Sequence, residues 1–236
     1  MRPIGSILLA LWLALITPFF SLLAIIITFL PAHRRYALIS QWSYLVIKAA
    51  RLCCGIRYRV IGLQNLPPQP CVLLSRHEST WETIAYQAIF PPQVMVLKKE
   101  LLRIPFFGWG LARMSPIAID RGSGRRALRQ VEEQGRERLA AGFYVVIFPE
   151  GTRMAPGAQR EYQSGGAWLA KKTGTQVVPV AVNSGYCWPK HSFFKRSGLI
   201  TVRIGTAFST ADLSVTDINM KVNQWIESQS DKDEKG

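Results

Sequence analysis

The stretch between Pro3 and Ala32 contains no charged side chain, and this limits the environments in which the chain can fold. Residues 7–16 are apolar around the whole circumference of a helix, which leaves no polar face for water. One membrane span needs about 20 apolar residues, and the stretch exceeds that length. A cleaved signal peptide fits less well, because its apolar core usually has about 7–15 residues and no small-x-small cleavage site follows. We therefore predict that residues 1–33 form a retained membrane anchor.

Two forms of this anchor are compatible with the sequence. The first is a single span. The second is a helical hairpin, because Thr17-Pro18 interrupts the segment near its middle and each arm would be too short to cross alone. Arg34 and Arg35 follow the segment, whereas Arg2 and the terminal amine precede it. This charge asymmetry predicts that the following domain lies on the cytoplasmic side of the inner membrane.

Residues 34–55 have an apolar pattern that includes Trp42, Tyr44 and Leu45. The pattern predicts a helix that lies along the membrane interface and leads into the next domain. An ordinary core helix would show the same pattern, so both interpretations stay open here.

The charge balance points to anionic partners. The chain has 29 Lys and Arg against 15 Asp and Glu, a formal net charge of +14. Nucleic acid is the usual first candidate for such a chain, but 48% of the residues are hydrophobic and the first third is strongly apolar. Anionic membrane lipid accounts for both facts, so we expect a membrane partner and no nucleic acid.

The region 56–229 alternates short apolar runs with helical patterns, which predicts one α/β domain. We expect a mixed, largely parallel sheet flanked by helices. The predicted strands are 57–61, 71–75, 94–97, 116–119, 143–148, 177–182 and 199–204, and the predicted helices are 125–141, 165–172 and 214–229. Residues 230–236 are small or charged, so we expect a frayed tail.

His77 stands at the end of a predicted strand, directly before a region where a helix could begin. A free imidazole titrates near pH ~6.5 and can therefore accept a proton from a hydroxyl at neutral pH. Glu82 lies five residues later, where the first turn of that helix could carry its carboxylate back to the ring. A carboxylate on one ring nitrogen would leave the other nitrogen free as a general base.

The same string also has a purely structural interpretation. Ser79 followed three residues later by Glu82 forms a capping box, S-x-x-E, before the apolar run 84–86. The two interpretations are compatible, because the cap would fix the backbone that directs Glu82.

FPEGTR, residues 148–153, follows another predicted buried strand. Gly151 permits a tight turn, so we expect Glu150, Thr152 and Arg153 to be presented at the sheet edge. A guanidinium offers a forked donor for a phosphate, and Thr152 and the loop amides could add hydrogen bonds. A single arginine after a glycine turn is more often simply solvated.

These motifs, in this order, resemble those of the glycerolipid acyltransferases that make phosphatidic acid, the 1-acylglycerol-3-phosphate O-acyltransferases. The resemblance runs from about Ile56 to Phe208. His77 and Glu82 match the first block, although Glu stands where the family more commonly has Asp. The further blocks are Lys98–Leu102 with Ile104–Gly108 and Ile119–Arg121, then FPEGTR, then Val178–Asn183.

The resemblance implies an enzyme that transfers a fatty acyl group from acyl-coenzyme A or acyl carrier protein to the sn-2 hydroxyl of lysophosphatidic acid. His77 would be the general base and Glu82 would orient it, with no covalent enzyme intermediate and no cofactor. The residues implied in substrate binding are Lys98, Lys99, Arg121, Glu150, Gly151, Thr152 and Arg153. The two lysines could equally be ordinary surface charges.

Metal chemistry finds little support. The four cysteines show no metal-ligand spacing, and HESTW departs from the HExxH pattern of zinc hydrolases. Three function classes stay open. They are the lysophosphatidic acid acyltransferase, a related enzyme using glycerol 3-phosphate, a lyso-ornithine lipid or another lysophospholipid, and a non-enzymatic module that binds anionic lipid.

Overall fold

The computed structural model describes the backbone of residues 1–90 and 92–233, and the side chains of these residues except 121 and 230–233. Seven strands form one sheet in the order β1-β7-β6-β2-β5-β3-β4. They are β1 (Ile56–Ile61), β2 (Val72–Ser75), β3 (Gln93–Lys98), β4 (Ile117–Ile119), β5 (Tyr144–Ile147), β6 (Val177–Val182) and β7 (Gly198–Ile204). All neighbouring strands are parallel except β6 and β7. The predicted α/β class and the predicted mixed, largely parallel sheet are therefore confirmed.

Eight α-helices accompany these strands along the described chain. They are α1 (Pro3–Ile26), α2 (Ala32–Ile39), α3 (Gln41–Cys54), α4 (Trp81–Ile89), α5 (Phe107–Ala112), α6 (Arg125–Ala140), α7 (Gly165–Thr173) and α8 (Val215–Asp233). The three helices predicted in the second half correspond to α6, α7 and α8. Helix α8 continues into the segment 230–236 that we expected to be frayed, so its end was predicted too early, and residues 234–236 lie outside the described residues.

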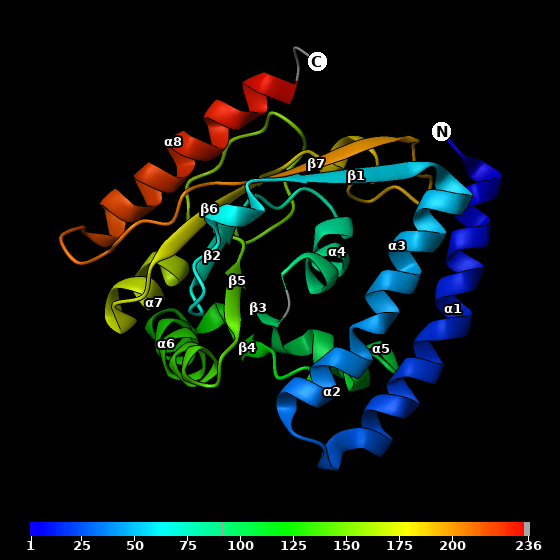
Figure 1. Ribbon diagram of the computed structural model, residues 1–236, viewed down its shortest axis with the longest axis horizontal. Helices are drawn as coiled ribbons and strands as arrows, with labels where there is room; N and C mark the ends of the chain where they lie inside the picture. Colours follow the sequence, from blue (N-terminus) through cyan, green and yellow to red (C-terminus); the bar gives the residue numbers. More distant parts are fainter. Residues whose placement is uncertain (91, 234–236) are drawn as a thin grey trace.

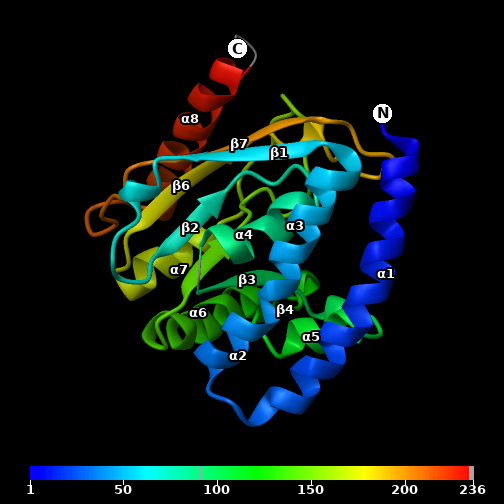
Figure 2. The same cartoon turned by 45° about the vertical axis from the view of Figure 1, so that its right-hand side comes forward.

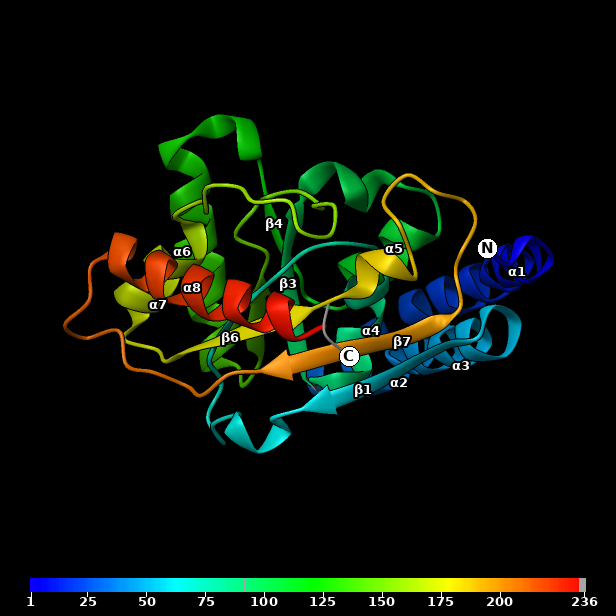
Figure 3. The ribbon, with the colours of Figure 1, turned by 90° about the horizontal axis from the view of Figure 1, so that it is seen from above.

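The helices form two layers, one on each face of the sheet (Figure 1). Because successive strand residues point to opposite faces, the apolar strands supply two cores. Leu73 packs in the core shared with α1, α3 and α4, whereas its neighbours Val72 and Leu74 pack in the core shared with α6, α7 and α8. Figure 3 shows the same division from above.

Helix α1 lies along α3 on the outside of the first layer (Figure 2). The chain does not turn back at Thr17-Pro18, because α1 continues through Pro18 as one helix. By length and composition, Pro3–Phe29 is the one helical segment among the described residues that could cross a membrane. The chain reverses only after residues 27–29, and α2 and α3 then return beside α1.

Hydrogen bonds and close packing join α1 to the rest of the domain at both ends. The backbone N–H of Arg2 donates to the carbonyl of Lys195 at 2.8 Å, and the N–H of Lys195 donates to the Ser6 hydroxyl at 2.8 Å. Near the other end, the Ser21 hydroxyl donates to the carbonyl of Phe106. A side chain at Gly5 would overlap the backbone carbonyl of Cys53, so glycine allows the approach of α1 to α3. Helix α1 is thus part of the folded domain.

Candidate active site

The parallel strands β2, β3, β5 and β6 end at the same edge of the sheet, and the segments that follow them meet there. In open α/β sheets this edge is where ligands bind. His77 follows β2, Phe148 follows β5, and Ser184 comes shortly after β6, while Lys98 is the last residue of β3. The topology therefore gathers residues from distant parts of the sequence around one point.

His77 and Glu82 form a hydrogen-bonded pair at this point. The ring nitrogen Nδ1 of His77 lies 2.8 Å from Oε1 of Glu82, whose side chain is 0% exposed in the first turn of α4. Oε1 also accepts the backbone N–H groups of Glu78 and Ser79, at 2.8 Å and 2.7 Å. Oε2 accepts the hydroxyls of Ser79 at 2.7 Å and of Ser184 at 2.5 Å.

These donors decide the charge of Glu82. Burial alone would raise its pKa, but the hydrogen bond and charge of His77, together with Ser184 and Ser79, outweigh burial and hold the pKa below its ordinary value. Glu82 is therefore a carboxylate at neutral pH and can only accept hydrogen bonds. It follows that Nδ1 of His77 carries a proton and Nε2 presents its lone pair on the other edge of the ring.

The structural interpretation of the first motif holds at the same time. The Ser79 N–H donates to Glu82, as in a capping box. The Ser79 hydroxyl accepts the N–H of Trp81 at 2.9 Å, one residue before the N–H that it accepts in the standard motif. Helix α4 begins at Trp81, with Thr80 in the cap position. One carboxylate thus caps the helix and contacts the histidine.

The FPEGTR turn is bonded directly to the His77 segment. Gly151 has a φ of 70°, as its predicted tight turn requires. The N–H of Met154 donates to the carbonyl of His77 at 2.7 Å, and the N–H of His77 donates to Oε1 of Glu150 at 3.3 Å. The imidazole also stacks on Phe148, with ring centroids 4.1 Å apart. The two motifs that the sequence singled out therefore form one site.

Glu150 occupies a different place from the one expected. It is 1% exposed and lies behind the backbone of His77, whereas the sequence suggested a side chain presented at the sheet edge. Burial raises its pKa to about 7, against the opposing effect of backbone N–H donors and of Arg76. Glu78, whose carboxylate lies 3.4 Å from Arg76, is also buried, and burial raises its pKa to about 7. Two buried carboxyls with raised pKa values, one from the residue after His77 and one bonded to its backbone, therefore lie close to the histidine.

A cavity of about 370 Å³ opens beside His77. It lies between the sheet and the helices α1, α3, α4 and α5, and most of its surface is apolar. Lys98 and Arg153 line it together with His77, and Nη1 of Arg153 donates to the Thr80 hydroxyl at 2.9 Å. Two cationic side chains and the histidine thus border the same space.

The remaining candidates for substrate binding lie in different positions. Lys99 pairs with Asp120 at 2.6 Å on the surface and is not among the residues that line the cavity. Thr152 is half-buried in the turn next to Gly151. The backbone of Arg121 begins a short 3-10 turn, but its side chain lies outside the described residues.

Sequence reasoning missed three residues that support the site. Ser184 binds Glu82, but the block matched after β6 ended one residue earlier, at Asn183. Lys190 donates from Nζ to the carbonyl of Arg153 at 2.9 Å, and nothing in its local sequence marks it. Arg76 is buried and reaches Glu227 of α8 at 2.9 Å, although its place beside His77 offered a signal.

Comparison with known proteins gives consistent results. The sequence model of the family described as Acyltransferase matches residues 57–183, which include every motif quoted above. A 1-acyl-sn-glycerol-3-phosphate acyltransferase of Pseudomonas aeruginosa is 44% identical over 201 residues, 84% of this chain and 78% of that protein. The yeast enzyme of the same name is 31% identical over 170 residues, 70% of this chain and 55% of that protein.

The fold has a counterpart among solved structures. A 1-acyl-sn-glycerophosphate acyltransferase of Thermotoga maritima superposes with a TM-score of 0.80 over 98% of this chain and 97% of that chain. The two sequences are 21% identical, so this likeness concerns the fold. It extends over almost the whole length, including the region of the N-terminal helices.

Proposed function

The chain belongs to the acyltransferase family, and from this premise we propose that it transfers a fatty acyl group from an acyl thioester to the sn-2 hydroxyl of lysophosphatidic acid. The product is phosphatidic acid. The observation that carries the proposal is the His77–Glu82 pair at the mouth of an apolar cavity that Arg153 and Lys98 also line.

The reaction needs one base and no covalent enzyme intermediate. Nε2 of His77 takes the proton of the lipid hydroxyl while the hydroxyl oxygen attacks the thioester carbonyl carbon. Glu82, held by five donors, stabilises the imidazolium that forms. The tetrahedral intermediate then collapses, the carbon–sulfur bond breaks, and the leaving thiolate takes the proton from His77. Acyl-coenzyme A and acyl carrier protein both present the required thioester.

Arg153 and Lys98 hold the phosphate of the acceptor. Both side chains line the cavity near His77, and Arg153 is oriented by its hydrogen bond to Thr80. A guanidinium and an ammonium together suit a phosphate monoester, which carries close to two negative charges at neutral pH. The apolar remainder of the cavity takes the acyl chain of the donor.

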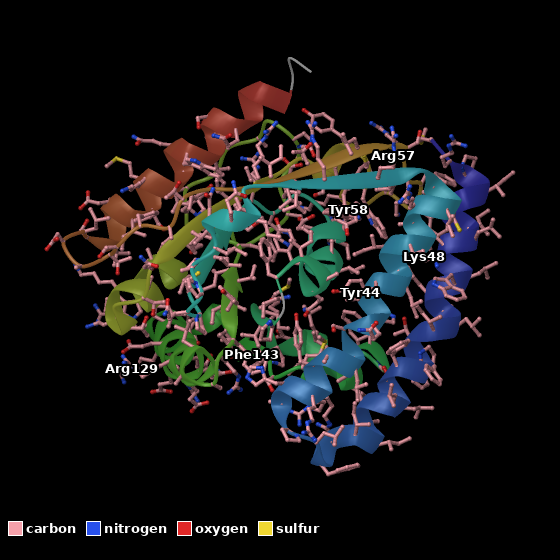
Figure 4. The ribbon with its side chains drawn as sticks, in the orientation of Figure 1. Tyr44, Lys48, Arg57, Tyr58, Arg129 and Phe143 are labelled. Atoms are coloured by element: carbon pink, nitrogen blue, oxygen red, sulfur yellow. The ribbon has the colours of Figure 1, made fainter. Side chains whose placement is uncertain are left out.

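The enzyme works at the cytoplasmic face of the inner membrane. The outer side of α1 exposes large apolar side chains, among them Leu8, Leu11, Leu15 and Phe19. Its inner side is bound to the domain, which favours insertion of α1 into one leaflet beside the active site over an independent span. Tyr44 and Lys48 on the neighbouring α3 are exposed and suit the interface with anionic lipid (Figure 4).

The test is acylation of lysophosphatidic acid by purified enzyme with acyl-coenzyme A as donor. His77→Ala should lower kcat by about 10²–10⁴-fold, the usual contribution of a general base. Glu82→Gln should lower kcat by about tenfold or more with little change in KM, because it perturbs the base and leaves the cations in place. His33→Gln, at a histidine stacked on Phe143 away from the site, is the matched control. Normal turnover by His77→Ala would refute the assignment.

A second measurement tests the phosphate. Arg153→Ala should raise KM for lysophosphatidic acid at least tenfold but leave the use of an uncharged monoacylglycerol nearly unchanged. Equal losses with both acceptors would remove Arg153 from the phosphate site. Glycerol 3-phosphate and other lysophospholipids in the same panel identify the preferred acceptor.

A further inference from the structure

Two glutamines carry unpaired amide groups in the wall of the cavity. Gln93 is 0% exposed and Gln87 is 8% exposed, and both line the cavity. Among the described residues no hydrogen-bond partner is found for either side-chain amide atom of Gln93 or for Oε1 of Gln87. A buried polar atom without a partner lowers the stability of the fold by about 1–3 kcal/mol. A ligand that pairs with these three atoms in the cavity would remove this penalty.

Three other polar groups in the same wall have hydrogen-bond partners. Thr83 donates its hydroxyl to the carbonyl of Thr80 at 2.7 Å, and Thr17 accepts the indole N–H of Trp42 at 3.2 Å. Ser21 donates to the carbonyl of Phe106. Unpaired polarity is therefore not a general property of this wall.

The two glutamines lie near each other at the end of the cavity remote from the catalytic histidine. Gln93 is the first residue of β3, whereas Lys98, at the mouth, is the last. Gln87 is in the last turns of α4, whose first turn holds Glu82. The Tyr36 hydroxyl donates to the carbonyl of Gln87 at 3.2 Å and also contacts the backbone of Gln93.

The length of the cavity is that of a long acyl chain. From Lys98 to Gln93 the strand advances five residues, about 17 Å at about 3.3 Å per residue. An extended alkyl chain advances about 1.27 Å per carbon–carbon bond, because its tetrahedral bonds zigzag, so about 17 Å corresponds to roughly thirteen bonds. A hexadecanoyl group, whose fifteen bonds span about 19 Å when extended, is therefore long enough to bring its distal end from a carbonyl at His77 to the glutamines.

We propose that Gln87 and Gln93 form a polar end to the acyl-binding cavity, which selects acyl donors with a hydroxyl near the distal end of the chain. A hydroxyl can donate to an amide oxygen and accept from an amide N–H, so it satisfies both kinds of unpaired atom. A methyl terminus of the same length fills the space and leaves these atoms unsatisfied, and a site built for a hydroxyl rejects an analogue that lacks it. This inference rests on the proposed function, since it assigns the cavity to the donor.

The experiment uses full-length enzyme in detergent with lysophosphatidic acid as acceptor. The donors are the coenzyme A thioesters of dodecanoic, tetradecanoic, hexadecanoic and ω-hydroxyhexadecanoic acid, supplied in competing pairs. The wild type should prefer the hydroxylated donor over hexadecanoyl by about tenfold in kcat/KM, the ratio expected from one unsatisfied buried group. Gln93→Leu and Gln87→Leu should each reduce this preference, and the double variant should reverse it.

Controls separate the possible failures. Thr83→Val changes a satisfied hydroxyl of the same wall and should keep the wild-type preference. Dodecanoyl is too short to reach the glutamines and is the reference donor to which the other rates of each variant are normalised. An equal use of both hexadecanoyl donors by the wild type would overturn the inference while leaving the proposed function intact. A preference that persists in the double variant would overturn the assignment to these residues. Lack of transfer from every donor would overturn the proposed function itself.

Discussion

Ser184 shows at the scale of one residue how the site is held. It comes from the segment after β6, 102 residues from Glu82, yet its hydroxyl donates to Oε2 at 2.5 Å in a fully buried position. Ser79 supplies a second hydroxyl to the same oxygen. Because a buried carboxylate needs donors on all its lone pairs, these serines keep Glu82 charged and correctly oriented.

We therefore expect Ser184→Ala to lower kcat about tenfold with little change in KM, because one charge-assisted hydrogen bond to the orienting carboxylate is lost. Steady-state kinetics with lysophosphatidic acid measure this effect. Ser184→Thr, which keeps a hydroxyl, should recover most of the activity. Thr210→Val removes a buried hydroxyl that bonds only to backbone carbonyls elsewhere and serves as the control. Unchanged turnover in Ser184→Ala would show that Ser79 and the backbone suffice.

The raised pKa values of Glu78 and Glu150 make the stability of the fold depend on pH. Burial raises the pKa of each to about 7, above the ordinary value of 4.5, so each binds its proton more tightly in the folded state. Their contribution to the free energy of unfolding is therefore fully present below about pH 4.5 and is lost as the pH rises to about 7. Glu82, with a lowered pKa, contributes in the opposite sense, and its contribution is lost at acid pH.

Urea unfolding at about pH 5 and about pH 7.5 measures this slope. The wild type should lose stability between the two values, and the double variant Glu78→Gln, Glu150→Gln should lose clearly less. Glu137→Gln, at an exposed carboxylate on α6, is the control and should behave as the wild type. The same slope in the double variant would mean that other groups are responsible.

At the scale of elements, α8 is joined to the loop that carries the histidine. Arg76 lies beside His77, is buried, and donates to Glu227 of α8 at 2.9 Å and to the carbonyl of Ala158 at 2.6 Å. Helix α8 thereby holds Arg76, the first residue after β2, in place.

Glu227→Ala should lower the free energy of unfolding by about 1–3 kcal/mol, because it leaves a buried guanidinium short of one acceptor. Thermal and urea unfolding measure the loss. Glu227→Gln keeps an acceptor and should lose less. Glu137→Ala removes an exposed carboxylate that pairs with Arg138 on the surface and should change stability little. If all three variants unfold alike, the bond to α8 contributes nothing.

At the scale of the whole molecule, α1 has two different sides. Its inner side packs on the domain and contributes Thr17, Phe20 and Ser21 to the cavity wall, so removal of residues 1–33 would damage the site as well as the anchor. Its outer side is apolar and exposed. Membrane binding can therefore be tested without deletion of the helix.

The triple variant Leu11→Ser, Leu15→Ser, Phe19→Ser should bind vesicles of phosphatidylglycerol and phosphatidylethanolamine at least about a hundredfold more weakly at high salt, because each buried apolar side chain contributes about 1.5–3 kcal/mol. Flotation measures binding, and activity on detergent-dispersed substrate checks the fold. Met220→Ser, at an exposed apolar residue of α8, is the control. Unchanged flotation at high salt would show that another surface inserts.

The extent of successful prediction also differs with scale. All seven strands were found to within one residue at either end, because short apolar runs between turn residues are a local signal. The pairing of His77 with Glu82 was predicted because both belong to one loop and helix turn. Whether α1 would continue through Pro18 was left open by the sequence, and the packing of α1 on α3 and α5 outweighs the loss of one helical hydrogen bond.

The sequence by itself determined the α/β class, the seven strands and the two motifs, because each depends on residues that are neighbours along the chain. Only the tertiary structure decided that Ser184 binds Glu82, that Glu150 lies behind His77, and that Gln87 and Gln93 share one end of a cavity. These contacts depend on the strand order β6-β2-β5-β3, which places distant segments side by side. No local period encodes that order, since it results from the packing of the whole sheet between its two helical layers.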